Sequence, residues 1–430
     1  MDTIFALATA HGKAGVSVIR ISGTLAWSAA EAFCADLPAS HKAGLRNLID
    51  PDGALIDQAL VLPFEDRKSF TGEPVVEFHL HGSTAIVARV MELLGLVPDL
   101  RLADPGEFTR RALENGKLDL AQVEGLADLI DAETEAQRKQ AVRVLAGELG
   151  RTAEVWRSDL IRAASLLEAT IDFADEDVPV DVTPEVLELL ERTQVAIAKE
   201  AEGVKTAERI RAGFEVAIIG APNVGKSTLL NAIAGRDAAI TSEFAGTTRD
   251  VIEVKLDLNG LAVTILDTAG LRETEDFVEK IGIDRAMSRA GEADLRVFLK
   301  THVDEELSVQ PLMGDIVLVG KSDVSRETFD NSISGKTGEG VDALVAKISK
   351  TLLKRTASAG IATRERHRQA LLQSQQYLQT AKDDLQLGPD HYDLVAEDMR
   401  SSIRALNSLI GHVDVENLLD EIFSSFCLGK

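Results

Sequence analysis

One short string of this sequence has the residue types and the spacing needed to hold phosphate groups. The string GAPNVGKS runs from Gly220 to Ser227 and matches the pattern G-x-x-x-x-G-K-[ST]. The apolar run 214–219 predicts a buried strand before it, and 228–234 predicts a helix after it. Backbone N–H groups of the loop and the helix N-terminus would face phosphate oxygens. Lys226 would reach the β- and γ-phosphates and the Ser227 hydroxyl would ligate Mg²⁺, so the string predicts a nucleotide-binding site.

A second group of residues would complete the contacts to Mg²⁺ and the γ-phosphate. Asp267 ends the apolar run 262–266, so its carboxylate could hold the Mg²⁺ shell through water, and the Gly270 N–H could sense the γ-phosphate. Asn-Gly at 259–260 predicts a hairpin before this strand. Thr248, between the loop and the hairpin, is placed to complete Mg²⁺ coordination. The order of loop, hairpin and D-x-x-G is that of a Ras-like G domain.

Two further strings would bind the base. They are GKSD at 320–323 and SGK at 334–336. The carboxylate of Asp323 can accept hydrogen bonds from the guanine N1–H and 2-amino groups, so we expect GTP to bind in preference to ATP. The usual signature is N-K-x-D, and Gly320 replaces its asparagine. Loss of that side chain is expected to loosen the packing between loops and to weaken affinity, while guanine selectivity persists.

The residue after D-T-A-G bears on hydrolysis. Ras-like enzymes place a glutamine there to orient the attacking water, but Leu271 has neither donor nor acceptor. Either the protein hydrolyses GTP slowly as a switch, or another group positions the water. The acidic stretch 273–279 offers candidates, although a solvated loop is the alternative interpretation.

Composition excludes several classes of protein. The net charge is −24, so the composition does not indicate a basic surface for nucleic-acid binding. If RNA is a substrate, local basic patches or a partner would have to supply the positive charge. Two cysteines, Cys34 and Cys427, cannot build a disulfide framework and suit a reducing cytosol. No apolar run reaches the roughly 18 residues of a membrane span, so we expect a cytoplasmic protein that does not enter membranes.

The pattern of the chain predicts a multidomain fold with α/β and α parts. Apolar runs at 16–21 and 75–80 predict strands and 85–94 predicts a helix, which gives an N-terminal α+β domain over 1–117. Helical periodicity then covers 118–212 and returns over 357–430. A Ras-like P-loop G domain over 213–356 would be inserted into one discontinuous helical domain. The alternative is two unrelated helical domains.

At this point the residues resemble a known family from end to end, the MnmE (TrmE) family of tRNA-modifying GTPases. The strings that carry the resemblance are IRISG at 19–23, SFTGE at 69–73 with HG at 81–82, PGEFT at 105–109, KLDLAQ at 117–122, DLID at 128–131, GTTRD at 246–250 and FSSFCLGK at 423–430. The resemblance implies that the N-terminal domain binds a tetrahydrofolate, in its 5-formyl or methylene form, and makes the protein a homodimer.

The resemblance also implies an activity. Such proteins form a heterotetramer with the flavin-dependent subunit MnmG and install a carboxymethylaminomethyl-type group at C5 of the wobble uridine of certain tRNAs. GTP hydrolysis to GDP is needed, and K⁺ takes the place of an arginine finger. A regulatory switch that only changes partners is the competing hypothesis, but it would need neither the N-terminal strings nor the Cys-Leu-Gly-Lys tail.

Site residues follow from the resemblance position by position. Asn223 matches a K⁺ ligand, as do Thr247 and, through their backbone carbonyls, Ser242 and Phe244. Glu279 matches the residue that orients the hydrolytic water. The whole set implied for GTP is Asn223, Val224, Gly225, Lys226, Ser227, Thr228, Ser242, Glu243, Phe244, Ala245, Gly246, Thr247, Thr248, Asp267, Thr268, Ala269, Gly270, Lys321, Asp323, Ser334, Gly335 and Lys336.

The folate site and the tail are implied in the same way. Arg20, Glu77, Lys117 and Lys430 match the positions that contact the folate, where basic groups can pair with its carboxylates and Glu77 can bond the pterin. Cys427 is either a nucleophile that adds to C6 of uracil or a structural thiol near the folate.

The sequence departs from the family pattern at three places. Gly320 and Gly335 replace the usual Asn and Ala of the base-binding loops, and the segment from Lys300 to Asp315 looks shorter than usual for a G domain. These departures bear on affinity and leave the expected fold unchanged.

Overall fold

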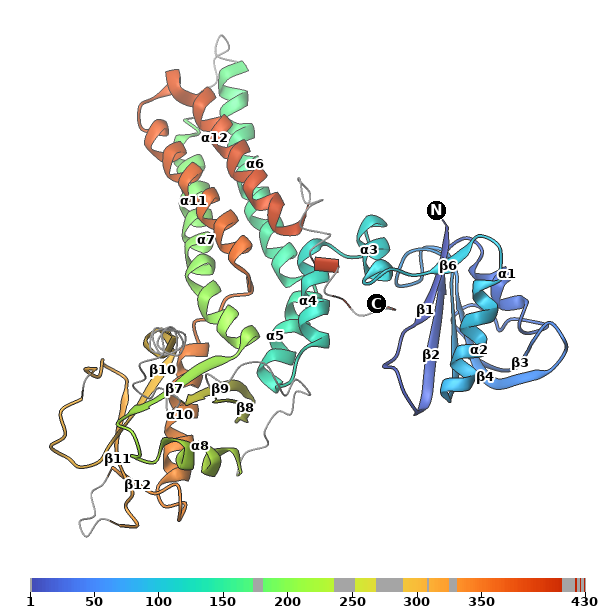
Figure 1. Ribbon diagram of the computed structural model, residues 1–430. Coiled ribbons are helices and arrows are strands. Elements are labelled where there is room, and N and C mark those ends of the chain that lie inside the picture. Colours follow the sequence, from blue (N-terminus) through green and yellow to red (C-terminus); the bar gives the residue numbers. More distant parts are fainter. Residues whose placement is uncertain are drawn as a thin grey trace, which may run out of the picture. The chain divides into compact units, whose positions relative to one another are not determined.

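The computed structural model describes residues 2–172, 181–235, 252–267, 289–307, 309–324 and 331–411, with 422, 423, 426 and 429 near the end of the chain. The chain forms two compact units (Figure 1). Unit 1 contains residues 1–127 and 407–430, and unit 2 contains residues 128–406. Among the helices of the described ranges, none combines the length and the apolar character that a membrane span requires.

Unit 1 is built on a six-stranded sheet of order β3-β4-β5-β2-β1-β6, in which only the β1–β6 pair is parallel. The strands are β1 (Thr3–Leu7), β2 (Ala14–Ser22), β3 (Gly44–Ile49), β4 (Leu55–Phe64), β5 (Val75–Gly82) and β6 (Leu100–Leu102). The helices are α1 (Ala26–Glu31), α2 (Thr84–Gly95), α3 (Glu107–Glu114) and most of α4 (Leu120–Ile130). The predicted strands at 16–21 and 75–80 and the helix at 85–94 are confirmed.

Side chains alternate across this sheet. In β5, Phe78 and Leu80 are buried against α1 and α2, together with Ile19 and Ile21 of β2. Glu77 and the other intervening residues of β5 therefore point to the opposite face, because successive side chains of a strand alternate. In β5 this alternation sends Phe78 and Leu80 into one core and leaves Glu77 on the opposite face.

A buried arginine joins distant parts of unit 1. The Arg111 side chain is 4% exposed and donates hydrogen bonds to Glu107, to Glu73 and to the backbone and side chain of Asp2. Burial disfavours the charged form of Glu107, but hydrogen bonds from Arg101, from the Asp104 N–H and from Arg111 hold its pKa below the ordinary value. The lowered pKa values of Glu107 and Asp2 favour their ionised forms beside this buried cation.

Replacing Arg111 by methionine is expected to destabilise unit 1 by about 3–5 kcal/mol near neutral pH, because the largely buried carboxylate of Glu73 loses its cation and that of Glu107 keeps only Arg101. The lowered pKa of Glu107 contributes stability that is present above its unfolded value, about 4.3, and is lost as pH falls through the folded value. The difference in free energy of unfolding between the wild type and the variant should therefore be smaller at acid pH.

Urea unfolding at pH 7 and pH 4 would measure this difference. The chain has two tryptophans, so a Trp156→Phe background leaves Trp27 of α1 as the reporter of unit 1. Lys68→Met is the control, since Lys68 makes an exposed pair with Glu65 and its loss should cost no more than about 1 kcal/mol. Equal losses in the two variants would contradict the prediction.

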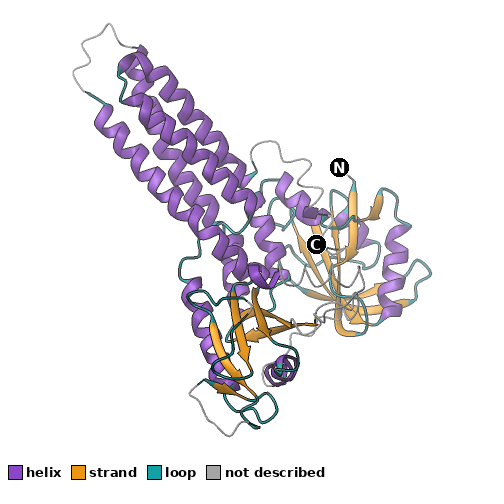
Figure 2. Cartoon of the chain, turned by 60° about the vertical axis from the view of Figure 1, so that its left-hand side comes forward, coloured by secondary structure: helices purple, strands orange, loops and turns teal. Residues whose placement is uncertain are grey.

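The helical part of unit 2 is formed by two segments of the sequence, one before residue 213 and one after residue 356. Its main helices are α5 (Glu135–Leu145), α6 (Glu148–Asp172), α7 (Thr183–Ala212), α11 (Glu365–Leu385) and most of α12 (Tyr392–Ile410), with the short 3₁₀ turn η2 (Pro389–His391) before α12. The helices α6, α7, α11 and α12 run side by side in Figures 1 and 2. Ser374 of α11 and Ser402 of α12, both fully buried, share a hydrogen bond of 2.7 Å.

Contacts of α7 with α11 and α12 join the two helical segments into one domain. Gln194 donates to Gln379 at 3.0 Å, and the Thr183 hydroxyl at the start of α7 bonds the Tyr392 hydroxyl at 2.9 Å. The discontinuous helical domain is therefore confirmed, and two unrelated helical domains are excluded. Residues 173–180 of the first predicted helical segment and most of residues 412–430 of the second lie outside the described residues.

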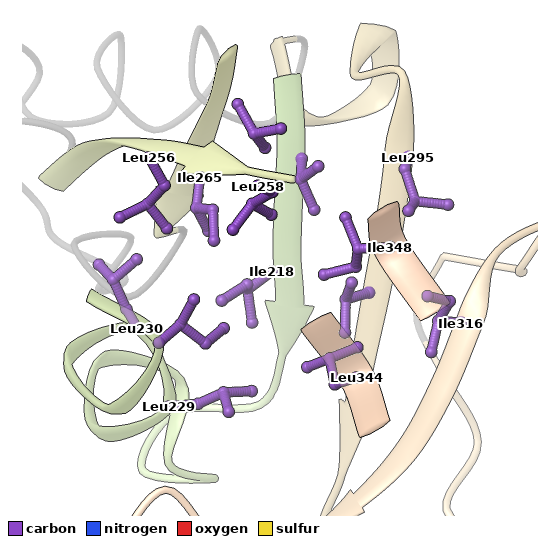
Figure 3. Close-up of a cluster of buried hydrophobic side chains, with 14 of the residues drawn as sticks. Ile218, Leu229, Leu230, Leu256, Leu258, Ile265, Leu295, Ile316, Leu344 and Ile348 are labelled. Carbon is purple, nitrogen blue, oxygen red and sulfur yellow. The ribbon is translucent and has the colours of Figure 1, made fainter. Parts of the chain in front are cut away.

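The second sheet has the order β12-β11-β10-β7-β9-β8 and is parallel except for β8. Its strands are β7 (Phe214–Gly220), β8 (Ile252–Leu258), β9 (Leu261–Asp267), β10 (Leu295–Lys300), β11 (Ile316–Gly320) and β12 (Ser332–Ile333). The helices α8 (Lys226–Ala234) and α10 (Val341–Thr356) pack on one face, where Leu229 and Leu344 meet Ile218 of the central strand (Figure 3). This is the predicted α/β arrangement.

The opposite face of this sheet has a smaller core. Ala217, Ile219 and Phe298 form it with Ala290. Between β10 and β11, the described residues 301–307 and 309–315 contain no helix, and Leu307 and Val309 of this connection pack against the face instead. The short segment noted in the sequence thus leaves an irregular connection rather than a covering helix.

The β8–β9 hairpin rests on the helical part of unit 2. Asn259 and Gly260 have φ of 55° and 84°, which confirms the predicted tight turn. The Gly260 carbonyl accepts a 3.0 Å hydrogen bond from the N–H of Ala136, in the first turn of α5. A helix start has N–H groups without intrahelical partners, and the hairpin satisfies one of them. Ala136 also packs on the core of the sheet.

Candidate nucleotide-binding site

The site is assembled at one edge of the parallel sheet. The strands β7, β9, β10, β11 and β12 run in the same direction, so their carboxyl ends meet there. Open α/β sheets bind ligands at this edge. Each predicted motif that the structure describes follows one of these strand ends, which explains how strings separated by a hundred residues come together.

The phosphate loop connects β7 to α8. Asn223 and Gly225 have φ of 60° and 112°, and these left-handed residues turn the backbone sharply before the helix. Lys226 is 4% exposed and its ammonium donates to the carbonyls of Gly220 and Ala221 at 2.8 and 3.0 Å. Burial lowers the pKa of this ammonium, and the charge of Asp267 opposes that shift. The loop therefore holds a poorly hydrated cation at its centre.

Oxygen ligands for a divalent cation lie beside the loop. Asp267 ends β9, is 1% exposed and stands opposite Ile218 in the adjacent strand β7. Ser227 is the second residue of α8 and is half-buried. A carboxylate and a hydroxyl are hard oxygen donors of the kind that Mg²⁺ prefers, so these residues fit that ion.

A cavity of about 330 Å³ lies between the phosphate loop and the two base-binding loops. Its lining includes Lys321 and Asp323 after β11 and Ser334 to Lys336 after β12. The Ser334 hydroxyl donates to Asp323 Oδ1 at 2.7 Å and accepts from the N–H groups of Lys336 and Thr337, both at 3.2 Å. These bonds fix the carboxylate that was predicted to read guanine.

The expected loosening at Gly320 is wrong. A Cβ atom on this residue would lie 2.8 Å from the Val224 carbonyl oxygen and 3.2 Å from Leu299 Cγ. A Cβ on Gly335 would lie 2.7 Å from the Leu229 nitrogen. The loops lie closer to the phosphate loop than any residue with a side chain would allow, because glycine lets two backbones approach directly.

Several predicted site residues lie outside the described part of the chain. For the nucleotide they are Ser242, Glu243, Phe244, Ala245, Gly246, Thr247, Thr248, Thr268, Ala269 and Gly270, and with them Leu271, Glu279, Cys427 and Lys430. The structure brings together the remaining nucleotide residues, namely Asn223 to Thr228, Asp267, Lys321, Asp323 and Ser334 to Lys336.

In unit 1 the structure pairs two of the predicted folate residues. Arg20 and Glu77 stand opposite each other on β2 and β5, and Arg20 Nε donates to Glu77 Oε1 at 2.9 Å. The Arg20 guanidinium also lies 5.7 Å from the ring centre of Phe70 and 5.6 Å from that of Phe108. Lys117 donates to the carbonyl of Arg67.

The two aromatic rings were not predicted as site residues. Phe70 and Phe108 lie within the strings SFTGE and PGEFT, so the signal was present, but neither string says that its phenylalanine lies over an arginine of another strand. The nucleotide cavity likewise contains Leu229 and Leu299, which the sequence marks only as core residues.

A phosphate loop, an aspartate at the end of the neighbouring strand and, in the G-K-S-D string, an aspartate held by a serine beside the cavity are the features of a P-loop GTPase. The family described as MnmE helical domain matches residues 120–427, and the family described as GTP-binding protein TrmE N-terminus matches residues 3–117. The chain belongs to the MnmE family of tRNA modification GTPases.

Relatives of the same length support this assignment. The tRNA modification GTPase MnmE of Roseobacter denitrificans is 61% identical and that of a Ruegeria species is 62% identical, each over 430 residues and 100% of both chains. Among solved structures, a variant of Aquifex aeolicus Era bound to GDP.AlF4- is 28% identical over 32% of this chain and 56% of its own, with a TM-score of 0.25. That score is too low to support an argument.

Proposed function

We propose that this chain is a K⁺-stimulated GTPase that works with the flavin-dependent subunit MnmG to add a carboxymethylaminomethyl-type group at C5 of the wobble uridine of certain tRNAs. The observation that carries the proposal is the nucleotide site, in which the phosphate loop holds a buried lysine and a fixed aspartate lines the cavity beside that loop. The names of the relatives supply the link to tRNA modification.

The described residues would divide the binding of GTP between them. Lys226 would exchange its bonds to the Gly220 and Ala221 carbonyls for bonds to phosphate oxygens, which are stronger because both partners are charged. Asp323 would accept from the guanine edge while Ser334 keeps its carboxylate oriented. Val224, Gly225, Thr228, Lys321, Gly335 and Lys336 would form the walls.

Two cations would supply charge stabilisation at the phosphates. Ser227 and Asp267 would hold Mg²⁺ together with Thr248, and Asn223 would contribute its amide oxygen to K⁺ together with Ser242, Phe244 and Thr247. An amide oxygen is a suitable ligand for K⁺, which is a weak Lewis acid. Asn223 lies in the phosphate loop, where its backbone is left-handed. Glu279 would then orient the attacking water, since Leu271 cannot.

Unit 1 would bind the tetrahydrofolate. The Arg20 guanidinium lies 5.7 and 5.6 Å from the ring centres of Phe70 and Phe108 and donates to Glu77, and it is the kind of group that pairs with a carboxylate of the folate. Lys117 and Lys430 would add charge, Glu77 would bond the pterin, and Cys427 would act either on the uracil ring or as a structural thiol. The protein would be a cytoplasmic homodimer, and its net charge of −24 leaves most of the tRNA-binding surface to the partner.

GTP hydrolysis in KCl and in NaCl at equal ionic strength tests the proposal. We expect the rate to be at least about tenfold higher in KCl, since one charge-stabilising group in a phosphoryl-transfer site is worth tenfold or far more. Asn223→Ala should lose this difference and keep most of its GTP affinity, because phosphate contacts through Lys226 remain. Ser322→Ala, on the base side of the site, should keep the difference.

Equal wild-type rates in the two salts would remove the K⁺ mechanism. Reconstitution with the partner subunit, a tetrahydrofolate and unmodified tRNA, followed by nucleoside analysis, tests the second half of the proposal. Hydrolysis without any new modified uridine would favour the competing switch hypothesis.

A further inference from the structure

Two glycines place the base-binding loops directly on the phosphate loop and its helix. Gly320 ends β11 against the Val224 carbonyl, and Gly335 follows β12 against the peptide between Thr228 and Leu229. One base-binding loop therefore contacts Val224 of the phosphate loop, and the other contacts the first turn of α8. Both glycines line the nucleotide cavity.

These contacts leave no room for a side chain. A Cβ on Gly320 would lie 2.8 Å from its nearest neighbour and one on Gly335 would lie 2.7 Å from its own, whereas ordinary contacts begin at 3.4 Å. Every near neighbour of Gly335 is a backbone atom of α8, and at Gly320 the second neighbour is Leu299, which is 1% exposed. Neither set of atoms can rotate away, so a side chain would push the loop itself.

The size of that push matters for a ligand that spans both halves of the site. Restoring an ordinary contact would require about 0.6 Å at Gly320 and about 0.7 Å at Gly335, whereas a binding constellation tolerates shifts of only about 0.5 Å. A nucleotide joins base and phosphates by covalent bonds of fixed length. Displacing the base-binding loops would thus stop it from satisfying Asp323 and Lys226 together.

Recognition of the base depends on a different contact. Asp323 is oriented by the Ser334 hydroxyl, which is itself held by the N–H groups of Lys336 and Thr337. These bonds lie within the base-binding loops and would move with them as one group. Distance to the phosphate loop and identity of the base are therefore set by separate residues.

We propose that Gly320 and Gly335 determine the affinity of this chain for guanine nucleotides, by closing the base-binding loops onto the phosphate loop through direct backbone contact. The inference rests on the proposed function and deepens it. It also reverses the expectation from the usual N-K-x-D signature, since an asparagine at position 320 weakens binding in this chain instead of strengthening it.

Equilibrium binding of a fluorescent GDP derivative, with competition by GTP and ADP, tests the proposal on the full-length chain. Gly320→Asn, Gly320→Ala and Gly335→Ala should each bind GDP and GTP about tenfold or more weakly, the cost expected when a well-packed contact is overfilled. The ratio of GDP to ADP affinity should stay unchanged. The alanine variants add one carbon each, so the result does not depend on the larger asparagine.

Gly291→Ala is the matched control, because a Cβ there has no neighbour within 4 Å. It should bind as the wild type does. A Gly320→Asn variant that binds GDP as tightly as the wild type, or more tightly, overturns the proposal, as does a loss of the preference for GDP over ADP. Failure of the wild type to bind guanine nucleotides would instead refute the proposed function.

Discussion

Replacing Lys226 by methionine is expected to weaken GTP binding by about a hundredfold or more and to abolish measurable hydrolysis. The lysine ammonium is buried in the phosphate loop, where it donates hydrogen bonds to the carbonyls of Gly220 and Ala221. Charge-assisted hydrogen bonds contribute about 1.5–3 kcal/mol each, so losing two corresponds to roughly two to four orders of magnitude in affinity. Titration with a fluorescent GTP analogue measures the affinity.

The fold of this variant should survive. Methionine fills a similar volume and removes an ammonium whose charged form is disfavoured by burial. Lys347→Met changes an exposed lysine of α10 and should leave affinity and hydrolysis unchanged. A Lys226→Met protein that still hydrolyses GTP at the wild-type rate would place the phosphates elsewhere.

Replacing Asp323 by asparagine is expected to reverse the preference of the site between two purines. Asparagine keeps one acceptor but presents an N–H donor where the carboxylate accepted the guanine 2-amino group. Xanthine has a carbonyl at that position and matches the new donor. We expect GDP to bind about a hundredfold more weakly and xanthosine diphosphate to bind more tightly than GDP.

Competition between the two diphosphates for a fluorescent nucleotide measures this reversal. Glu202→Gln, at an exposed position of α7, is the control for loss of a carboxylate and should change neither affinity. If Asp323→Asn still prefers GDP, then a group other than Asp323 reads the base.

The fold and the nucleotide site could be predicted because their signals are local. The strand before Gly220, the helix after Lys226 and the turn at 259–260 are each encoded by a few consecutive residues. Parallel strands then bring their carboxyl ends together whatever the length of the connections between them. The position of Asp323 beside the phosphate loop needed no more information than this.

Contacts between distant segments could not be predicted in the same way. Nothing near Arg111 in the sequence indicates that it binds Asp2, 109 residues away. The approach of Arg20 to the rings of Phe70 and Phe108 depends on how a loop and a helix are packed against β2. The error at Gly320 has the same origin, because a missing side chain can mean a gap or a closer approach, and only the backbone separation decides between them.

The contact of α5 with the β8–β9 hairpin determines where the G domain could be separated from the rest of the chain. A fragment of residues 213–356 would lose Ala136 and Ala359, which pack on its core, and Ile210, which is part of it. It would also leave the Gly260 carbonyl without its N–H donor from α5. The nucleotide-binding part of this protein therefore depends on the neighbouring helices to cover its hydrophobic core. We expect an excised G domain to expose part of that core to solvent.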